Sequence, residues 1–151
     1  MSLTLAIISE SRKDDNRTPL TPSQVKHLLK KFSNLKIIVE PSKNRCFKDE
    51  DYLKAGSIIK SDISEANIIL GIKEVNINKL IANKTYLFFS HTIKMNKNNL
   101  EGTQGTPGVE KKELLKEIIR KNITLIDYEN IRDNSVNAYR YLGFGRFAGI
   151  V

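Results

Sequence analysis

The sequence predicts an α/β domain of the Rossmann-like kind, in which a mainly parallel sheet lies between two layers of helices. Short apolar runs bounded by polar residues, such as 68–72 and 86–89, are typical of buried strands. Segments with apolar residues at helical spacing alternate with these runs, which favours a parallel sheet. The length of 151 residues and the hydrophobic content of 40% suffice for one ordinary core. We therefore expect a single domain over residues 1–151.

The first strand and the first helix carry the clearest signals. An apolar run predicts a strand over Leu3–Ser9, and a polar loop follows it. Thr21 suits the N-cap of a helix, Pro22 suits its first position, and Gln24 completes a capping box. The helix then presents one apolar stripe to the sheet, made of Val25, Leu28, Leu29 and Phe32.

Four shorter elements are expected before the centre of the chain. Lys36–Glu40 predicts a second strand. Asp49–Ala55 predicts a short helix, because acidic residues occupy its first turn and Gly56 follows its end. Ser57–Lys60 predicts a small strand, and Ser61–Ala66 predicts a turn of helix.

The remaining strands and helix complete the expected sheet. Ile68–Ile72 and Tyr86–Phe89 predict two buried strands, and Asn76–Ala82 can return the chain from the end of one to the start of the next. Leucines and isoleucines at helical spacing predict a helix over 114–119. Ile123–Ile126 predicts the last strand, which ends at residues 127–129.

Two residues able to move protons follow the central strands, Lys73 after the first and His91 after the second. A strand–crossover–strand unit brings both strand ends to one edge of a parallel sheet, where open α/β sheets bind their ligands. We therefore expect Lys73 and His91 to face one crevice, with Glu129 and Arg17 at the same edge. The alternative is a solvated loop lysine and a loop histidine, since most residues at strand ends take no part in chemistry.

Composition narrows the class of protein. The net charge is +8, but the lysines are dispersed and no basic stripe with interleaved aromatics is present, so we expect no nucleic-acid partner. No apolar run approaches the roughly 20 residues that cross a bilayer, and we expect no membrane association. The single cysteine, Cys46, cannot form an internal disulfide, which fits a reducing compartment. No metal site is expected.

Two segments of the sequence look irregular. Residues 95–112 contain EGTQGTPG at 101–108, and this glycine-rich composition predicts an exposed loop. A phosphate cradle is the alternative, but the P-loop lysine and the strand–GxGxxG–helix context are missing. The apolar run at 139–151 stops without a cap or a polar tail, which suggests a chain that has been cut or that continues into a second domain.

Six runs of residues carry a resemblance to a known family. They are NRTPLTP (16–22), EPSKNRCFKDEDYLKAG (40–56), DISEANIILGIKE (62–74), KTYLFFSHTIK (84–94), LIDYE (125–129) and FGRFAGIV (144–151). Together they resemble the N-terminal domain of lysine–2-oxoglutarate reductases, the first half of bifunctional aminoadipic semialdehyde synthases, in the saccharopine dehydrogenase family. The resemblance covers nearly the whole chain in order, with alanine dehydrogenases and transhydrogenases as more distant relatives.

The resemblance implies a two-domain enzyme with a cleft between the two domains. Residues 1–151 would be the catalytic, substrate-binding domain, and a Rossmann domain for the nicotinamide cofactor would follow, since no GxGxxG turn is present here. The implied reaction joins lysine to 2-oxoglutarate as an imine and reduces it with NADPH to saccharopine, while some members run the reverse with NAD. The implied location is the cytoplasm, or the mitochondrial matrix for a eukaryotic bifunctional enzyme. The fragment alone is expected to be inactive.

The same resemblance implies the proton-transfer residues. Lys73, in ILGIKE, matches the lysine that acts as acid and base at the substrate nitrogen. His91, in FFSHTIK, matches the histidine that handles protons while water adds and leaves at the imine carbon. Glu74 and Glu129 match acidic residues that tune these two groups. Such chemistry needs groups that exchange protons near neutral pH, as imidazoles do and as amines do in buried or like-charged surroundings.

Substrate binding is assigned by the resemblance to basic residues. Arg17, in NRTPLTP, matches an arginine for a substrate carboxylate, Arg140 matches a second one, and Arg12 or Lys13 occupies a further basic position. The intermediate carries three carboxylates, which suit arginines in bidentate geometry. The alternative for the arginines is an ordinary surface role. The glycine-rich loop departs from the family, which joins FFSHTIK to the next helix directly, and it would be a lid, a surface decoration or a lineage-specific insertion.

Two other functions stay open at this point. An alanine dehydrogenase-like oxidoreductase domain shares the fold and a Lys/His pair. A stand-alone amino-acid-binding module would keep the fold without catalysis. A GxGxxG domain encoded after residue 151 would favour an enzyme, whereas a stop codon there would favour the module.

Overall fold

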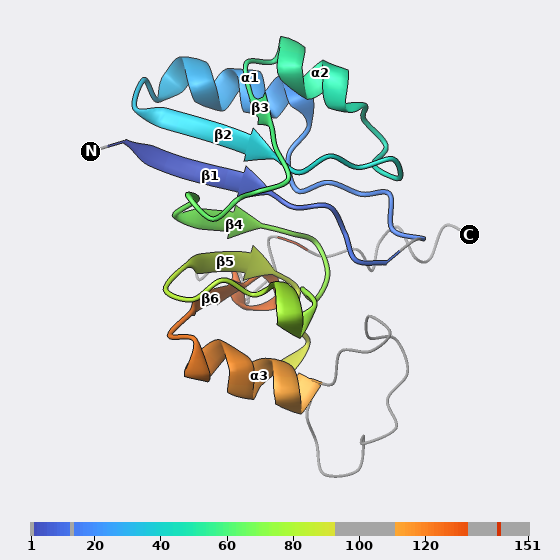
Figure 1. The fold of residues 1–151 in the computed structure, drawn as a ribbon. Helices are drawn as coiled ribbons and strands as arrows, with labels where there is room; N and C mark the ends of the chain where they lie inside the picture. The colour runs from blue at the N-terminus through green and yellow to red at the C-terminus, as the bar shows by residue number, and fades with distance from the viewer. Residues whose placement is uncertain (1, 13, 93–110, 133–141, 143–151) are drawn as a thin grey trace.

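A six-stranded sheet forms the centre of the computed structural model, which describes residues 2–12, 14–92, 111–132 and 142. All its strands are parallel, in the order β3-β2-β1-β4-β5-β6 (Figure 1). The strands are β1 (Leu3–Ile7), β2 (Leu35–Val39), β3 (Ile58–Ile59), β4 (Ile68–Leu70), β5 (Thr85–Phe88) and β6 (Thr124–Asp127). The helices are α1 (Pro22–Lys31), α2 (Asp49–Lys54) and α3 (Lys111–Arg120), with short 3₁₀ turns η1 (Ile77–Lys79) and η3 (Tyr128–Asn130).

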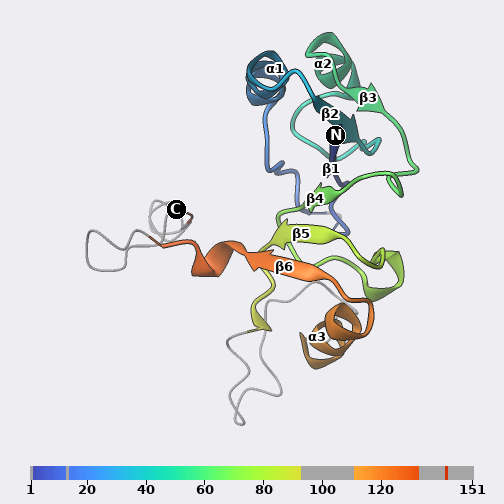
Figure 2. The same ribbon diagram turned by 90° about the vertical axis from the view of Figure 1, so that its left-hand side faces the viewer.

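Helices lie on both faces of the sheet, because side chains alternate along each strand and make both faces apolar. On one face, Phe88 belongs to a buried cluster that includes Leu114 of α3. On the other face, Ile7 belongs to a cluster with Val25 of α1 and Tyr52 of α2. Figure 2 shows α1 and α3 on opposite sides of the sheet. The predicted three-layer α/β fold with a parallel sheet is confirmed.

The strand order reverses between β1 and β4. From β1 the chain builds outward through β2 to β3, and then returns to place β4 on the other side of β1. The register pairs Leu5 with Ile68 and Ile7 with Leu70. A reversal of this kind opens a crevice at the carboxyl ends of the two central strands, where open α/β sheets bind ligands.

The predicted start of α1 is confirmed in detail. The Thr21 hydroxyl accepts the Gln24 N–H, the Gln24 side chain accepts the Thr21 N–H, and Pro22 is the first helical residue. Val25 is buried as expected. Phe32, however, is the C-cap and is 45% exposed, so the apolar stripe ends one turn earlier than predicted.

The elements around α2 differ from the prediction in one place. Gly56 ends α2 with φ of +99°, a conformation that suits glycine at a helix end. Ser61–Ala66 forms a single hydrogen-bonded turn, in which the Ala66 N–H donates to the Ile63 carbonyl at 2.9 Å, but no longer helix. The Asp62 carboxylate accepts the Ser64 N–H at the start of this turn.

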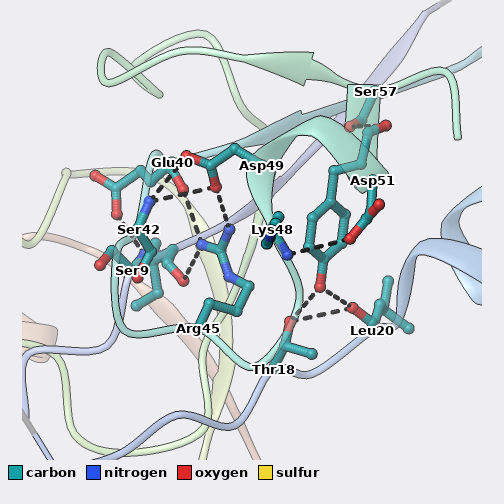
Figure 3. A network of polar contacts seen from close by, with 12 residues as sticks. Ser9, Thr18, Leu20, Glu40, Ser42, Arg45, Lys48, Asp49, Asp51 and Ser57 are labelled. Carbon is teal, nitrogen blue, oxygen red and sulfur yellow. Dashed lines mark hydrogen bonds and ion pairs between the residues drawn. The ribbon is translucent and has the colours of Figure 1, made fainter. Parts of the chain in front are cut away.

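A buried arginine ties the ends of the first two strands together (Figure 3). The Arg45 side chain is 2% exposed and donates to the Glu40 carbonyl at 2.8 Å and to Asp49 at 3.1 Å. It also approaches the Ile8 carbonyl at 3.5 Å and lies over the Tyr52 ring at 5.2 Å. Because Glu40 and Ile8 follow β2 and β1, Arg45 fixes the edge from which the site is built.

Several sequence expectations concern residues outside those that the structure describes. The glycine-rich loop at 101–108 is one, and the apolar run at 139–151 is another apart from Leu142. Over the described ranges, no helix is both long enough and apolar enough to span a membrane. In the same part of the chain, no group of three or more His, Cys, Asp or Glu residues is arranged to hold a metal ion.

Candidate functional site

Lys73 lies at the carboxyl edge of the sheet, three residues after β4 ends. Its side chain lines a hollow of about 430 Å³, which we call the Lys73 hollow. The other residues that line it come from the loop after β1 and are Arg12, Asp14, Asp15, Asn16 and Arg17. The hollow therefore combines a lysine from one central strand with two arginines from the other.

Two ion pairs shape the arginine side of the Lys73 hollow. Arg17 binds Asp15 through two hydrogen bonds, Nε–Oδ1 at 2.8 Å and Nη2–Oδ2 at 2.5 Å. This bonding to Arg17 holds the pKa of Asp15 below its ordinary value, with a smaller contribution from Lys73. Arg12 binds Asp14 in the same bidentate way, at 3.0 and 2.6 Å. The Arg17 side chain is 41% exposed.

His91 follows β5 and is held by the residue next to Lys73. Its Nδ1 lies 2.6 Å from Oε1 of Glu74, whose side chain is only 1% exposed. The imidazole stacks on Phe89 with 6.4 Å between ring centroids, and the backbone of His91 is in the left-handed region with φ of +54°. With Nδ1 bound to the carboxylate, Nε2 is left for other partners.

The Lys73 hollow and the Glu74–His91 pair lie at the same edge of the sheet, although neither Glu74 nor His91 lines the hollow. Lys73 and Glu74 are consecutive residues, and Glu74 is close enough to Arg12 to raise the pKa of that guanidinium, although Asp14 is the larger cause. The backbone pairing of β4 and β5 continues past both strands, because the Phe89 N–H donates to the Ile72 carbonyl at 3.0 Å. The fold thus brings Lys73, Glu74, His91 and Arg17 to one edge.

Sequence reasoning missed a carboxylate at this edge. Glu10, in the loop after β1, accepts the backbone N–H groups of Ile72 at 2.7 Å and Lys73 at 3.0 Å. Burial raises its pKa above the ordinary glutamate value. No local pattern marks Glu10, since its partners are more than sixty residues away. Only the pairing of β1 with β4 reveals the contact.

The end of β6 adds Glu129 to the same edge of the sheet. Glu129 is buried in η3, and its N–H donates to Oδ1 of Asp127 at 2.9 Å. The other carboxylate oxygen of Asp127 accepts the hydroxyl of the buried Ser90, which links the ends of β6 and β5. Two other candidates, Arg140 and Lys13, lie outside the described residues.

The connection from β1 to α1 lacks the turn that dinucleotide-binding domains use. In dinucleotide-binding domains, a glycine-rich turn leads directly from the first strand into a helix whose N-terminus meets the pyrophosphate. Here the connection between β1 and α1, residues 8–21, contains no glycine. Its charged side chains line the Lys73 hollow instead.

The fold and this edge define the class of protein. The chain belongs to the family of alanine dehydrogenase/PNT N-terminal domains, whose model matches residues 6–150. Among solved structures, an L-alanine dehydrogenase resembles it with a TM-score of 0.68 and 18% identity, over 88% of this chain and 34% of that one. At this identity, the likeness shows the fold alone.

Two further relatives share more of their sequence with this chain than the alanine dehydrogenase does. Mitochondrial alpha-aminoadipic semialdehyde synthase of Bos taurus is 40% identical over 151 residues, which cover 96% of this chain and 14% of the relative. Saccharopine dehydrogenase (NAD(+), L-lysine-forming) of Candida glabrata is 35% identical over 155 residues, 99% of this chain and 37% of the relative. The resemblance inferred from the sequence is confirmed, and these relatives are oxidoreductases. The chain spans well under half the length of either one.

Proposed function

We propose that the chain is the substrate-binding and acid–base domain of a saccharopine-forming lysine–2-oxoglutarate reductase. The observation that carries the proposal is the Glu74–His91 hydrogen bond beside the Lys73 hollow, at the edge where parallel sheets bind ligands. Two proton-transfer groups and two arginines share this edge. The identity of 35–40% to aminoadipic semialdehyde synthases and a saccharopine dehydrogenase supports the same reaction class.

The proton transfers of the proposed reaction fall to Lys73 and His91. Lys73 takes a proton from the ammonium group of lysine, so that the free amine can attack the ketone carbon of 2-oxoglutarate. His91 donates a proton to the oxygen that leaves as water when the imine forms. Glu74 orients the imidazole through Nδ1 so that Nε2 faces the substrate, and Glu129 tunes the pair from the end of β6. A bound nicotinamide would supply the hydride.

The substrate carboxylates would bind to the arginines. Arg17 lines the hollow with a partly exposed side chain, and Asp15 holds its guanidinium in place. Arg12 lines the same hollow, and Arg140 is the proposed second carboxylate ligand. The net charge of +8 adds a positive field that suits the anionic 2-oxoglutarate and saccharopine.

The cofactor in this proposal is NADP, with NAD as the alternative, held mainly by a Rossmann domain outside residues 1–151. The proposed partners are lysine, 2-oxoglutarate, saccharopine and that Rossmann domain. Neither nucleic acid nor a membrane takes part. The location would be the cytoplasm, or the mitochondrial matrix in a eukaryote, where the bovine relative is found according to its name.

An assay of the complete enzyme tests the proposed reaction. Oxidation of NADPH is followed with lysine and 2-oxoglutarate in one reaction, and with pyruvate and ammonia in another. We expect turnover only with the first pair of substrates. Turnover with pyruvate and ammonia alone would contradict the proposal and point to an alanine dehydrogenase-like enzyme.

Replacing Lys73 tests its role in proton transfer. In the complete enzyme, Lys73→Met is expected to lower turnover about 100-fold or more, because a positioned acid–base group is lost. The fold is expected to survive, since Lys73 lines a hollow rather than the core. Lys79→Met, at an exposed position of η1, is the matched control and is expected to leave turnover unchanged. Turnover of Lys73→Met within a few-fold of wild type would contradict the assignment.

A further inference from the structure

Glu10 is a carboxylate at the site that the proposed reaction does not use. Its Oε1 accepts the Ile72 N–H at 2.7 Å, and its Oε2 accepts the Lys73 N–H at 3.0 Å. Each oxygen thus holds one of two consecutive backbone N–H groups directly after β4. Hydrogen bonds to an ionised carboxylate are about twice as strong as neutral ones, so this contact is a firm link between the loop after β1 and the end of β4.

The two N–H groups form an anion cradle at the point where the strand order reverses. Successive backbone N–H groups in a turn bind anions, and the reversal point is where open sheets accept the anionic groups of ligands. Gly71 lets β1 approach the cradle closely, since a Cβ there would lie 2.8 Å from Cδ1 of Ile8 and 3.5 Å from Oε1 of Glu10. The chain's own carboxylate therefore fills a position suited to an external anion.

We propose that Glu10 is the positioning residue for Lys73, acting as a built-in anion that fixes the backbone from which the lysine side chain enters its hollow. The N–H that Glu10 holds belongs to Lys73 itself, so the carboxylate sets where the Cα–Cβ bond of Lys73 starts. A shift of about 1 Å in a reacting group can cost about 100-fold in rate. Fixing this backbone therefore bears directly on proton transfer.

Opposing influences act on the pKa of Glu10. Burial is the largest influence and raises its pKa, while the N–H groups of Ile72 and Lys73 lower it. Among the charged neighbours, Asp15 raises this pKa and Arg17 lowers it. The hydrogen bonds and the arginine thus oppose the cost of burying the charge.

Nuclear magnetic resonance of the 151-residue chain tests whether Glu10 holds the cradle. Amide protons bonded to a carboxylate resonate downfield, so in Glu10→Gln the Ile72 and Lys73 amide signals are expected to move upfield. Glutamine keeps one acceptor oxygen but places its NH₂ group against the second N–H, so at least one bond is lost. Unchanged amide signals in Glu10→Gln would overturn the proposal.

Glu40→Gln is the matched control. Glu40 also follows a strand of this sheet and accepts one backbone N–H, that of Ser9, at 2.8 Å. It lines a different hollow, of about 240 Å³, in which Lys73 takes no part. The variant is expected to leave the Ile72 and Lys73 amide signals unchanged. An equal effect of Glu40→Gln would mean that any carboxylate at this edge disturbs Lys73, and would overturn the specific role of Glu10.

Chemical rescue separates positioning from general stability. Glu10→Ala leaves space beside the two N–H groups, and formate added to this variant is expected to restore the downfield amide signals. Formate is expected to leave Glu10→Gln unchanged, because the glutamine side chain still fills the space. If Glu10→Ala does not fold, the Glu10→Gln result decides alone. If formate did not change the amide signals of a folded Glu10→Ala variant, the proposal that Glu10 acts as a built-in anion would be overturned.

Kinetics of the complete enzyme connect the cradle to proton transfer, a step that rests on the proposed function. Glu10→Gln is expected to lower kcat about tenfold or more while KM for each substrate changes less than twofold, because Lys73 is displaced and the arginines are not. A rise in KM at unchanged kcat would overturn the positioning role. If the complete enzyme does not reduce the imine at all, the proposed function fails, whereas the amide measurements still decide the role of Glu10.

Discussion

His91 shows how strongly a single site residue is constrained. Its imidazole is bonded to Glu74 on one side and stacks on Phe89 on the other, and its backbone has φ of +54°. Few non-glycine residues adopt this left-handed conformation, and such residues gather at functional sites because the surrounding structure must hold them there. The ring orientation is therefore set by the fold before any substrate binds.

Two substitutions of His91 separate chemistry from backbone conformation. In the complete enzyme, His91→Asn and His91→Val are both expected to lower turnover about 100-fold, because the proton-transfer group is lost. His91→Val is expected to be about 1–2 kcal/mol less stable than His91→Asn, since asparagine tolerates the left-handed region and a β-branched residue does not. Urea denaturation of the chain gives the two free energies of unfolding. Equal values for the two variants would contradict a backbone constraint at this position.

The Asp15–Arg17 pair makes stability depend on pH in acid. Hydrogen bonding to Arg17 places the folded-state pKa of Asp15 below the ordinary 3.8. A lowered carboxylate pKa stabilises the fold fully above about pH 4, and this stabilisation is lost as pH falls through the folded-state pKa. Asp15→Asn is expected to remove about 1 kcal/mol of stability at neutral pH, a modest value because Arg17 is 41% exposed and screened by solvent.

Urea midpoints measured from neutral pH down through the titration of Asp15 test this expectation. The difference between wild type and Asp15→Asn is expected to shrink as the pH falls. Asp14→Asn is the control, because Asp14 binds Arg12 in the same bidentate way but is 70% exposed. A difference between wild type and Asp15→Asn that stayed constant across this range would show that ionisation of Asp15 does not matter.

Some residues of the site could be predicted from the sequence alone, and others could not. Lys73 and His91 were predictable because each ends an apolar run, so the parallel sheet places both at one edge. Glu10 and Arg45 were missed, since their contacts join β1 with β4 and with β2. Such contacts depend on strand order, which local patterns do not contain. The catalytic roles of Lys73 and His91 stay predictions.

At the scale of elements, the helix ends that depend only on neighbouring residues were predicted correctly. The capping box of α1 and Gly56 at the end of α2 depend only on neighbouring residues, and both were predicted. The helical turn expected at Ser61–Ala66 is present only as a single turn, closed by the Ala66 N–H and the Ile63 carbonyl, and no helix continues from it. β4 is shorter than expected and ends at Leu70, although single hydrogen bonds to the chain after β5 continue as far as Ile72.

Arg45 provides a test of how elements are joined. Its buried guanidinium connects the ends of β1 and β2 with Asp49 at the start of α2. Arg45→Met is expected to lower the free energy of unfolding by about 3 kcal/mol, because the Glu40 carbonyl and Asp49 lose their buried partner. Arg45→Lys is expected to recover only part of this, since an ammonium group cannot reproduce the planar fork. Urea denaturation gives the free energies of unfolding. If Arg45→Lys were as stable as wild type, a positive charge alone would be enough to join these elements.

At the scale of the whole molecule, the alternation of strands and helices was enough to predict the layers. The strand order was not predicted, because nothing in a single strand specifies its neighbours. That order decides the site, since it places β1 beside β4 and so brings Arg17 and Glu10 to Lys73. A different order of the same strands would keep the core and separate these residues.

The same topology predicts how the 151-residue chain behaves toward NADPH. A dinucleotide would need a glycine-rich turn after β1 and free N–H groups at the strand reversal. Here the connection from β1 to α1 has no glycine, and Glu10 occupies the two N–H groups after β4. Calorimetry of the 151-residue chain with NADPH is therefore expected to show no micromolar site, while the complete enzyme, as the control, is expected to bind. A micromolar site in the chain itself would mean that these residues contribute to the cofactor site, contrary to the proposed division of roles between domains.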